Sequence, residues 1–118
     1  MFPVLSSVLN IKRKTGSTNP EKFPQLDPVI HSRIRLAILS ILISVKDADF
    51  NYLKKTIGTT DGNLSTHLTK LEEINYIKVT KGYKGKMPHT SCSLTTKGKQ
   101  AFSKYIEALD ALLHFKKE

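Results

Sequence analysis

One stretch constrains the fold of this chain more than any other: the run TTDGNLSTHLTKLEEINY, from Thr59 to Tyr76. Its apolar residues recur at spacings of four, three and three, at Leu64, Leu68, Leu71 and Ile74. This spacing places them on one face of a helix. Thr60 can cap the helix with its side-chain oxygen, and Asp61 adds negative charge near the first turn, where the helix dipole favours it. We therefore predict a short amphipathic helix over residues 60–74.

The opposite face of this helix carries mostly short polar side chains. At about 100° per residue, it consists of Gly62, Thr66, Thr69 and Glu73, with Asn63, Ser65 and Lys70 on the flanks. A helix that is only solvated usually carries many Glu/Lys pairs, whereas small hydrogen-bonding residues suit a narrow polar groove such as the major groove of DNA. Because Ser, Thr and Asn also occur on solvated faces, the neighbouring sequence has to decide between the two interpretations.

A second short helix precedes the first one closely. Residues 51–57, NYLKKTI, place Leu53 and Ile57 on an inward face, and Gly58 ends the helix in the position that glycine favours. Two helices joined by a short turn containing glycine are typical of a helix-turn-helix, in which the second helix enters the groove.

After residue 74 the hydrophobic period changes from 3.6 to 2. Residues 76–80 and 89–94 alternate as strands do, and residues 81–86 form a glycine-containing connection typical of a hairpin tip. A helix-turn-helix followed directly by a hairpin is a winged helix. Residues 75–100 contain no acidic residue and six lysines: Lys78, Lys81, Lys84, Lys86, Lys97 and Lys99. This favours a surface that follows phosphates, and the net charge of +9 likewise favours nucleic acid, with an anionic membrane surface second.

The two terminal helices carry more apolar surface than one small core can bury. Asp27 and Pro28 predict the start of a helix that runs to about Val45. The last helix, from Thr95 to about Phe115, has one stripe formed by Phe102, Ile106, Leu109 and Leu113 and another formed by Ala101, Tyr105, Ala108 and Leu112. We predict that one stripe closes the core and that the other joins a homodimer; a single wider core is the alternative. The predicted interface residues are Leu36, Leu39, Ile43, Tyr105, Ala108 and Leu112.

The chain is expected to form one domain over residues 27–115, preceded by an N-terminal extension and linker over residues 1–26. The extension is interpreted as a frayed tail, a packing helix or a basic arm. Its first residues do not fit a secretory signal, because the charged part follows a short apolar part. Residues 34–45 are too short for the roughly 20 residues that cross a bilayer. We therefore expect a cytoplasmic protein without a membrane partner.

The sequence indicates neither catalysis nor a cofactor. Its single cysteine, Cys92, excludes an intramolecular disulfide framework and a Cys-rich metal site. Cys92 occupies an inward strand position typical of a small hydrophobic residue, although the nearby lysines leave a redox-sensing thiol open. His67 lies beside the leucine face of the recognition helix and is interpreted as a packing residue rather than a metal ligand. Because no Ser/His/Asp set, carboxylate pair or phosphate loop is present, we predict no enzyme, no cofactor and no metal.

The region from Asp49 to Phe102 resembles the winged helix-turn-helix transcription regulators of the MarR/ArsR type, and most of all a small family of winged-helix DNA-binding domains. Three segments carry the resemblance in order: DGNLSTHLTKLEE (61–73), YIKV (76–79) and LTTKGKQAF (94–102). The likeness covers roughly residues 27–115. It implies an α+β, mostly α fold: a winged helix-turn-helix with a two-stranded β-hairpin wing and a long C-terminal helix. It also implies a dimer joined by the terminal helices. The CxC-type metal site of ArsR proteins is absent, since the corresponding helix reads NYLKKTI.

The resemblance also implies which residues contact DNA. Asn63, Ser65, Thr66, Thr69 and Lys70 fall where the recognition helix meets the major groove. Tyr83, Lys84 and Lys86, in a lysine-rich wing at about 81–88, would contact phosphates or the minor groove, and Lys54 and Lys55 the backbone. We therefore predict sequence-specific binding of double-stranded DNA by a dimeric transcription regulator, a repressor. The alternative is a winged helix that serves as a protein-interaction module in a transcription or partition complex. The operator and any small-molecule effector stay open.

Overall fold

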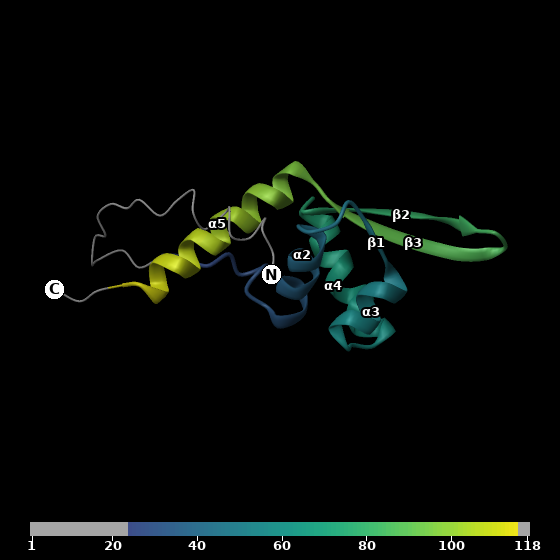
Figure 1. The fold of residues 1–118 in the computed structure, drawn as a ribbon, viewed down its shortest axis with the longest axis horizontal. Helices are drawn as coiled ribbons and strands as arrows, with labels where there is room; N and C mark the ends of the chain where they lie inside the picture. The colour runs from purple at the N-terminus through teal and green to yellow at the C-terminus, as the bar shows by residue number, and fades with distance from the viewer. Residues whose placement is uncertain (1–23, 116–118) are drawn as a thin grey trace.

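The computed structural model describes residues 24–115 (Figure 1). In chain order its elements are α2 (Arg33–Leu42), β1 (Ala48–Asp49), α3 (Phe50–Ile57), α4 (Asp61–Glu73), β2 (Ile77–Lys84), β3 (Met87–Leu94) and α5 (Thr96–Leu113). Helices α2, α3 and α4 form a body from which the β2–β3 hairpin and helix α5 extend in opposite directions (Figure 1). This confirms the predicted mostly α winged-helix fold. Residues 1–23 of the predicted N-terminal extension lie outside the described residues. The predicted domain boundary at residue 26 therefore stays a prediction.

The first described helix begins five residues later than the sequence predicted. The Asp27 carboxylate does accept hydrogen bonds from the backbone N–H groups of Val29 (2.9 Å) and Ile30 (3.4 Å), but these stabilise only a single turn. Ser32 then adopts an extended backbone (φ −154°), and its hydroxyl accepts from the N–H of Arg35 to cap α2. The short polar side chain of Ser32 offers a cap that interrupts the helical path begun at Asp27. The helix ends at Leu42, short of the predicted Val45.

The helix-turn-helix forms as the sequence predicted. Asp49 caps α3, whose C-terminus is closed by Gly58 in the left-handed conformation (φ 76°), where a side chain would be strained. Thr60 caps α4 by accepting from the N–H of Asn63 at 3.2 Å. Each of these helix ends is set by the local hydrogen bonds of one or two residues, and the sequence therefore predicts it well.

The sheet is larger than the predicted two-stranded wing. Strand β1 pairs with β3 through Ala48↔Cys92, which gives an antiparallel sheet in the order β1-β3-β2. The predicted connection at residues 81–86 was too long, because pairing continues from Ile77↔Leu94 to Lys84↔Met87. Only Gly85 and Lys86 form the tip, with Gly85 at φ 66°. The far half of the ladder has no apolar alternation, and backbone hydrogen bonds extend the strands there without such a signal.

One core lies where the three body helices meet the base of the sheet and the start of α5. Its buried residues are Ile30, Ile34, Ile38, Leu39, Leu42, Ala48, Leu53, Leu64, Leu68, Leu71, Ile77, Cys92, Phe102, Tyr105 and Ile106. Leu64 and Leu71 of α4 are fully enclosed. Fully burying a leucine side chain contributes about 1.5–3 kcal/mol. The recognition helix is therefore held by the same apolar face that the sequence predicted for it.

Helix α5 is divided along its length rather than around its circumference. Up to Ile106 it supplies Phe102, Tyr105 and Ile106 to the core, so both predicted stripes are buried there. At its far end Leu112 and Leu113 are exposed by 38% and 70%. The expectation that one whole stripe is buried and the other whole stripe is free is therefore wrong. None of the described helices combines the length and the apolar character needed to cross a membrane.

Candidate nucleic-acid interface

Helix α4 presents an exposed polar face opposite its buried leucines. All five side chains predicted to meet DNA from this helix are exposed: Asn63, Ser65, Thr66, Thr69 and Lys70. The Thr66 hydroxyl donates to the carbonyl oxygen of Gly62 at 2.9 Å. Its single hydrogen is thereby used, and the outward side of Thr66 offers a methyl group and acceptor lone pairs. These groups complement the thymine methyl and the amino groups of adenine and cytosine in the major groove.

One flank of α4 lies against the base of the wing. A cavity of about 180 Å³ separates them, lined by Phe50, Ser65, Leu68, Thr69, Glu72, Val79, Lys81 and Thr90. Ser65 and Thr69 therefore share a surface with Lys81 of β2 and Thr90 of β3. Sequence reasoning treated the recognition helix and the wing as separate features, and the structure brings them together.

The other flank of α4 is bonded to α2. Nη1 of Arg35 lies 2.9 Å from Nδ1 of His67, and Nε of the same arginine donates to the carbonyl oxygen of Val29. Burial, reinforced by the positive charges of Arg35 and Lys70, lowers the pKa of His67. His67 was predicted as a packing residue and does lie half-buried at this seam. Arg35 was missed, because its partner is 32 residues away in the sequence and no local pattern connects them.

At its N-terminus, α4 is tied to α3 by an ion pair. Nζ of Lys54 lies 2.8 Å from Oδ1 of Asp61, whose side chain is 72% exposed. Lys54 was predicted to contact the DNA backbone, and here its charge is engaged by an acid on the recognition helix. Lys55, the other predicted contact on α3, is exposed.

The wing is exposed along its outer half. Tyr83 is 76% exposed, and Lys84 and Lys86 beside it are exposed as well. Nε2 of His89, on β3, lies 3.7 Å from Oδ2 of Asp49, on β1. The backbone N–H of Tyr52, which Asp49 caps, is the main cause that lowers the pKa of Asp49, and His89 adds to it.

The predicted dimer residues do not share one free surface. Leu39 and Tyr105 are buried within the single chain, so neither offers area to a partner. The Tyr105 hydroxyl also forms a 3.0 Å hydrogen bond with Nδ1 of His31. Leu36, Ile43 and Ala108 are half-buried, and Leu112 is exposed. The interface assignments of Leu39 and Tyr105 are therefore corrected, because both side chains pack into the core of the single chain.

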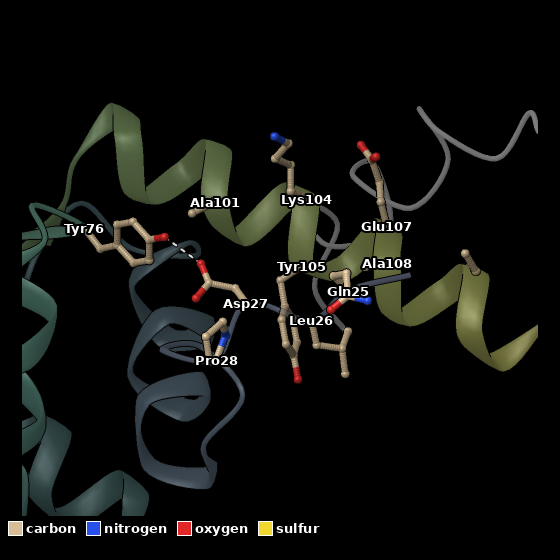
Figure 2. A pocket seen from close by; sticks show the side chains of 11 residues that line it. Gln25, Leu26, Asp27, Pro28, Tyr76, Ala101, Lys104, Tyr105, Glu107 and Ala108 are labelled. Atoms are coloured by element: carbon tan, nitrogen blue, oxygen red, sulfur yellow. Dashed lines mark hydrogen bonds between the residues drawn. The ribbon is translucent and has the colours of Figure 1, made fainter. Parts of the chain in front are cut away.

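A larger cavity of about 680 Å³ lies between the segment that enters the domain and α5 (Figure 2). It is lined by Gln25, Leu26, Asp27, Pro28, Tyr76, Ala101, Lys104, Tyr105, Glu107, Ala108 and Ala111. In its wall the Tyr76 hydroxyl donates to Oδ2 of Asp27, as the dashed line in Figure 2 marks. Nothing in the sequence pattern joins these two residues.

The sequence also raised the questions of a redox-sensing thiol and of a metal site. Cys92 is 1% exposed, and burial raises the pKa of its thiol to about 11, so it is a thiol rather than a reactive thiolate at neutral pH. Within residues 24–115, no three His, Cys, Asp or Glu side chains are grouped so as to hold a metal ion.

Comparison with known proteins places this geometry in a family. The family model for winged helix DNA-binding domains matches residues 34–113. An uncharacterised protein from Methanocaldococcus jannaschii is 40% identical over 79 residues, which are 66% of this chain and 85% of that protein. The structure of a transcriptional regulator homologue from Pyrococcus horikoshii superposes with a TM-score of 0.68 at 26% identity, covering 72% of this chain and 84% of that one. At 17% identity, the zinc-responsive MarR family member ZitR from Lactococcus lactis shares the fold, with a TM-score of 0.52 over 94% of this chain and 74% of that one. The chain belongs to the winged helix DNA-binding domain family, and its fold is that of MarR-type transcriptional regulators.

Proposed function

We propose that this protein binds double-stranded DNA in a sequence-specific manner as a homodimer and represses transcription. Helix α4 enters the major groove, and the lysine-rich wing follows the flanking backbone or minor groove. The observation that carries the proposal is the exposed polar face of α4 beside a wing whose lysines have no acidic neighbour in sequence from residue 75 to 100. Repression then follows from occupying a promoter.

The division of labour between the two parts follows from their side chains. Thr66 faces outward with a methyl and an acceptor, which suits base edges. The wing offers Tyr83, Lys84 and Lys86, which suit phosphates and the sugar backbone. Base contacts give sequence preference, and lysine–phosphate contacts give affinity that falls with salt.

The homodimer is supported by the far end of α5. Leu112 and Leu113 are exposed where the helix has left the body, and Figure 1 shows this part of α5 pointing away from the wing. A two-fold dimer would place two copies of α4 at half-sites whose centres lie about 10 base pairs, or a multiple of that, apart. The preferred DNA site should then be a near-palindrome.

The experiment is a gel-shift titration on random duplex DNA at about 50 mM and 200 mM salt, followed by selection of bound sequences from a randomised pool. We expect binding at low salt, a steep loss at high salt and enrichment of a near-palindrome. Absence of binding at low salt would refute the proposal and favour a protein-interaction module. Enrichment of a single half-site would refute the two-fold dimer.

A further inference from the structure

The Arg35–His67 contact fixes where the histidine carries its proton. A guanidinium group has only N–H donors, so Nδ1 of His67 must accept the hydrogen bond from Nη1 of Arg35. The neutral imidazole then carries its proton on Nε2. Arg35 is itself held in place, because its Nε donates to the carbonyl oxygen of Val29. His67 therefore has one defined tautomer.

Nε2 of His67 is not fully enclosed by the described residues. Nε2 has no hydrogen-bond partner among residues 24–115, and in that part of the chain no buried side-chain nitrogen or oxygen lacks a partner. An unpartnered Nε2 must therefore be accessible. His67 is half-buried: the Nδ1 edge of its ring is hydrogen-bonded to Arg35, and the Nε2 edge is accessible.

The open edge joins a row of hydrogen-bond donors on one flank of α4. Asn63, His67 and Lys70 follow one another at spacings of four and three, so they lie on one side of the helix. Both neighbours are exposed. The acids Asp61 and Glu72 fall on the other flank, which faces the wing, and Glu73 lies on the outward face with Thr66, since each residue advances by about 100°. The α2 side of α4 thus offers an amide, an imidazole N–H and two cations, counting Arg35, with no carboxylate between them.

We infer that this flank, the donor row formed by Arg35, Asn63, His67 and Lys70, contacts the backbone of one DNA strand, with His67 donating from Nε2 to a phosphate oxygen. Arg35 acts as a positioning residue that holds the His67 tautomer. Asn63 and Lys70 are then backbone contacts, and Thr66, which faces outward between the flanks, reads bases. The inference rests on the proposed function and deepens it by adding one contact, His67, and its positioning residue, Arg35, on the side opposite the wing.

The first test needs no DNA. In protein labelled with ¹⁵N at histidine, two-bond nitrogen–proton couplings distinguish a proton on Nε2 from one on Nδ1. We expect the free protein at neutral pH to hold His67 as the Nε2–H tautomer, and Arg35→Met to give a mixture of both. A His67 that carries its proton on Nδ1, or that is already mixed in the wild type, would overturn the positioning role.

The second test uses two substitutions that each keep one edge of the ring. His67→Asn places an amide oxygen near the position of Nδ1 and can still accept from Arg35, but offers nothing near Nε2. His67→Gln places an amide N–H near Nε2 and loses the acceptor. His114→Asn, an exposed histidine at the end of α5, is the matched control.

We expect His67→Asn to weaken binding to specific and random duplexes alike by roughly tenfold, the scale of one hydrogen bond to a charged group. The salt slope should not change, because a neutral imidazole releases no counterion, whereas Lys70→Ala should reduce the slope by about 0.9. His67→Gln should recover part of the affinity. If the wild type binds and His67→Asn binds equally well, this inference falls alone. If the wild type binds no duplex at low salt, the proposed function falls instead.

Discussion

The hydroxyl of Tyr76 donates a 2.5 Å hydrogen bond to Oδ2 of Asp27, and the two residues belong to segments 49 positions apart. The other carboxylate oxygen of Asp27 accepts from the N–H of Val29. The carbonyl oxygen of Tyr76 accepts from both the hydroxyl and the N–H of Thr95. Tyr76 therefore joins the segment that enters the domain, the end of the recognition helix and the start of α5.

Replacing Tyr76 with phenylalanine should destabilise the fold. The change removes one hydrogen bond and leaves a half-buried carboxylate oxygen without its donor, so we expect the free energy of unfolding to fall by about 1–2 kcal/mol. Urea denaturation measures it. Tyr83→Phe is the matched control, because that tyrosine is 76% exposed in the wing. Equal losses in the two variants would contradict the structural role of Tyr76.

The same bond has an alkaline signature. Burial, followed by the Asp27 hydrogen bond and charge, raises the pKa of Tyr76 from 10.0 to about 12. A group with a raised pKa stabilises the fold below its unfolded pKa and loses that contribution as pH rises through its folded pKa. Tyrosinate absorbance should therefore show a step near pH 12 in the wild type, and Tyr76→Phe should remove it.

Gly98 cannot carry a side chain in this structure. A Cβ atom there would lie 2.0 Å from the carbonyl oxygen of Tyr76, which is backbone and cannot move aside cheaply. We expect Gly98→Ala to lower the free energy of unfolding by about 1–3 kcal/mol, the usual cost of overpacking. Gly62→Ala is the control: its Cβ would meet nothing within 4 Å, and alanine favours the helix by up to about 1 kcal/mol. In thermal denaturation, the melting temperature should fall for Gly98→Ala and rise for Gly62→Ala.

The fold should lose stability in mild acid through His67. Its pKa is lowered by burial first and then by Arg35 and Lys70, and protonation would also remove the acceptor for Arg35. Because the folded pKa lies below the unfolded value of about 6.5, this contribution is complete above about pH 6.5 and declines as pH falls below it. His67→Asn, which keeps the acceptor and does not titrate, should flatten that decline. Urea denaturation between about pH 5 and 7 measures the difference.

The Lys54–Asp61 ion pair should restrain DNA affinity. Asp61→Asn removes a negative charge from the start of the recognition helix and frees Lys54 for a phosphate. We expect tighter binding and a salt slope that is steeper by about 0.9, with stability changed by no more than about 1 kcal/mol. Asp47→Asn, an exposed acid in the loop before β1, controls for net charge. An identical gain in both variants would show that only net charge matters.

Substitutions in the wing and in the recognition helix should affect DNA binding in different ways. Lys84→Ala combined with Lys86→Ala should weaken binding to every sequence and reduce the salt slope by roughly two, about 0.9 for each neutralised phosphate. Thr66→Ala should leave the slope unchanged and relax sequence preference by up to about tenfold. Titration of specific and random duplexes over a salt series separates the two. An unchanged slope in the lysine variant would contradict the wing assignment.

The parts of the fold that the sequence predicts are those decided within one turn of the chain. Thr60, Gly58 and Thr95 each cap a helix through their own hydrogen bonds, and each does so where the sequence indicated. At the start of α2 two such signals compete, Asp27 and Ser32. Local rules do not say which one continues into a helix.

The features that the sequence left out depend on distant partners or on the backbone alone. Arg35 meets His67, and Asp27 meets Tyr76, only after the fold has formed. The outer wing is paired although its side chains are exposed on both faces, so no alternation marks it. The exposure of the predicted DNA contacts agrees with their sequence pattern, and their roles stay predictions until DNA is bound.

The long ladder between β2 and β3 also limits how such a wing can change in evolution. Ile77 and Val79 face the body, and Lys81 and Tyr83 continue on that side because side chains alternate along a strand. Loss of the single pair Thr80↔Ser91 would turn every side chain beyond it to the opposite side. Loss of two successive pairs would shorten the wing and keep its lysines on their original sides. Viable length changes within these strands should therefore come in even numbers of residues per strand.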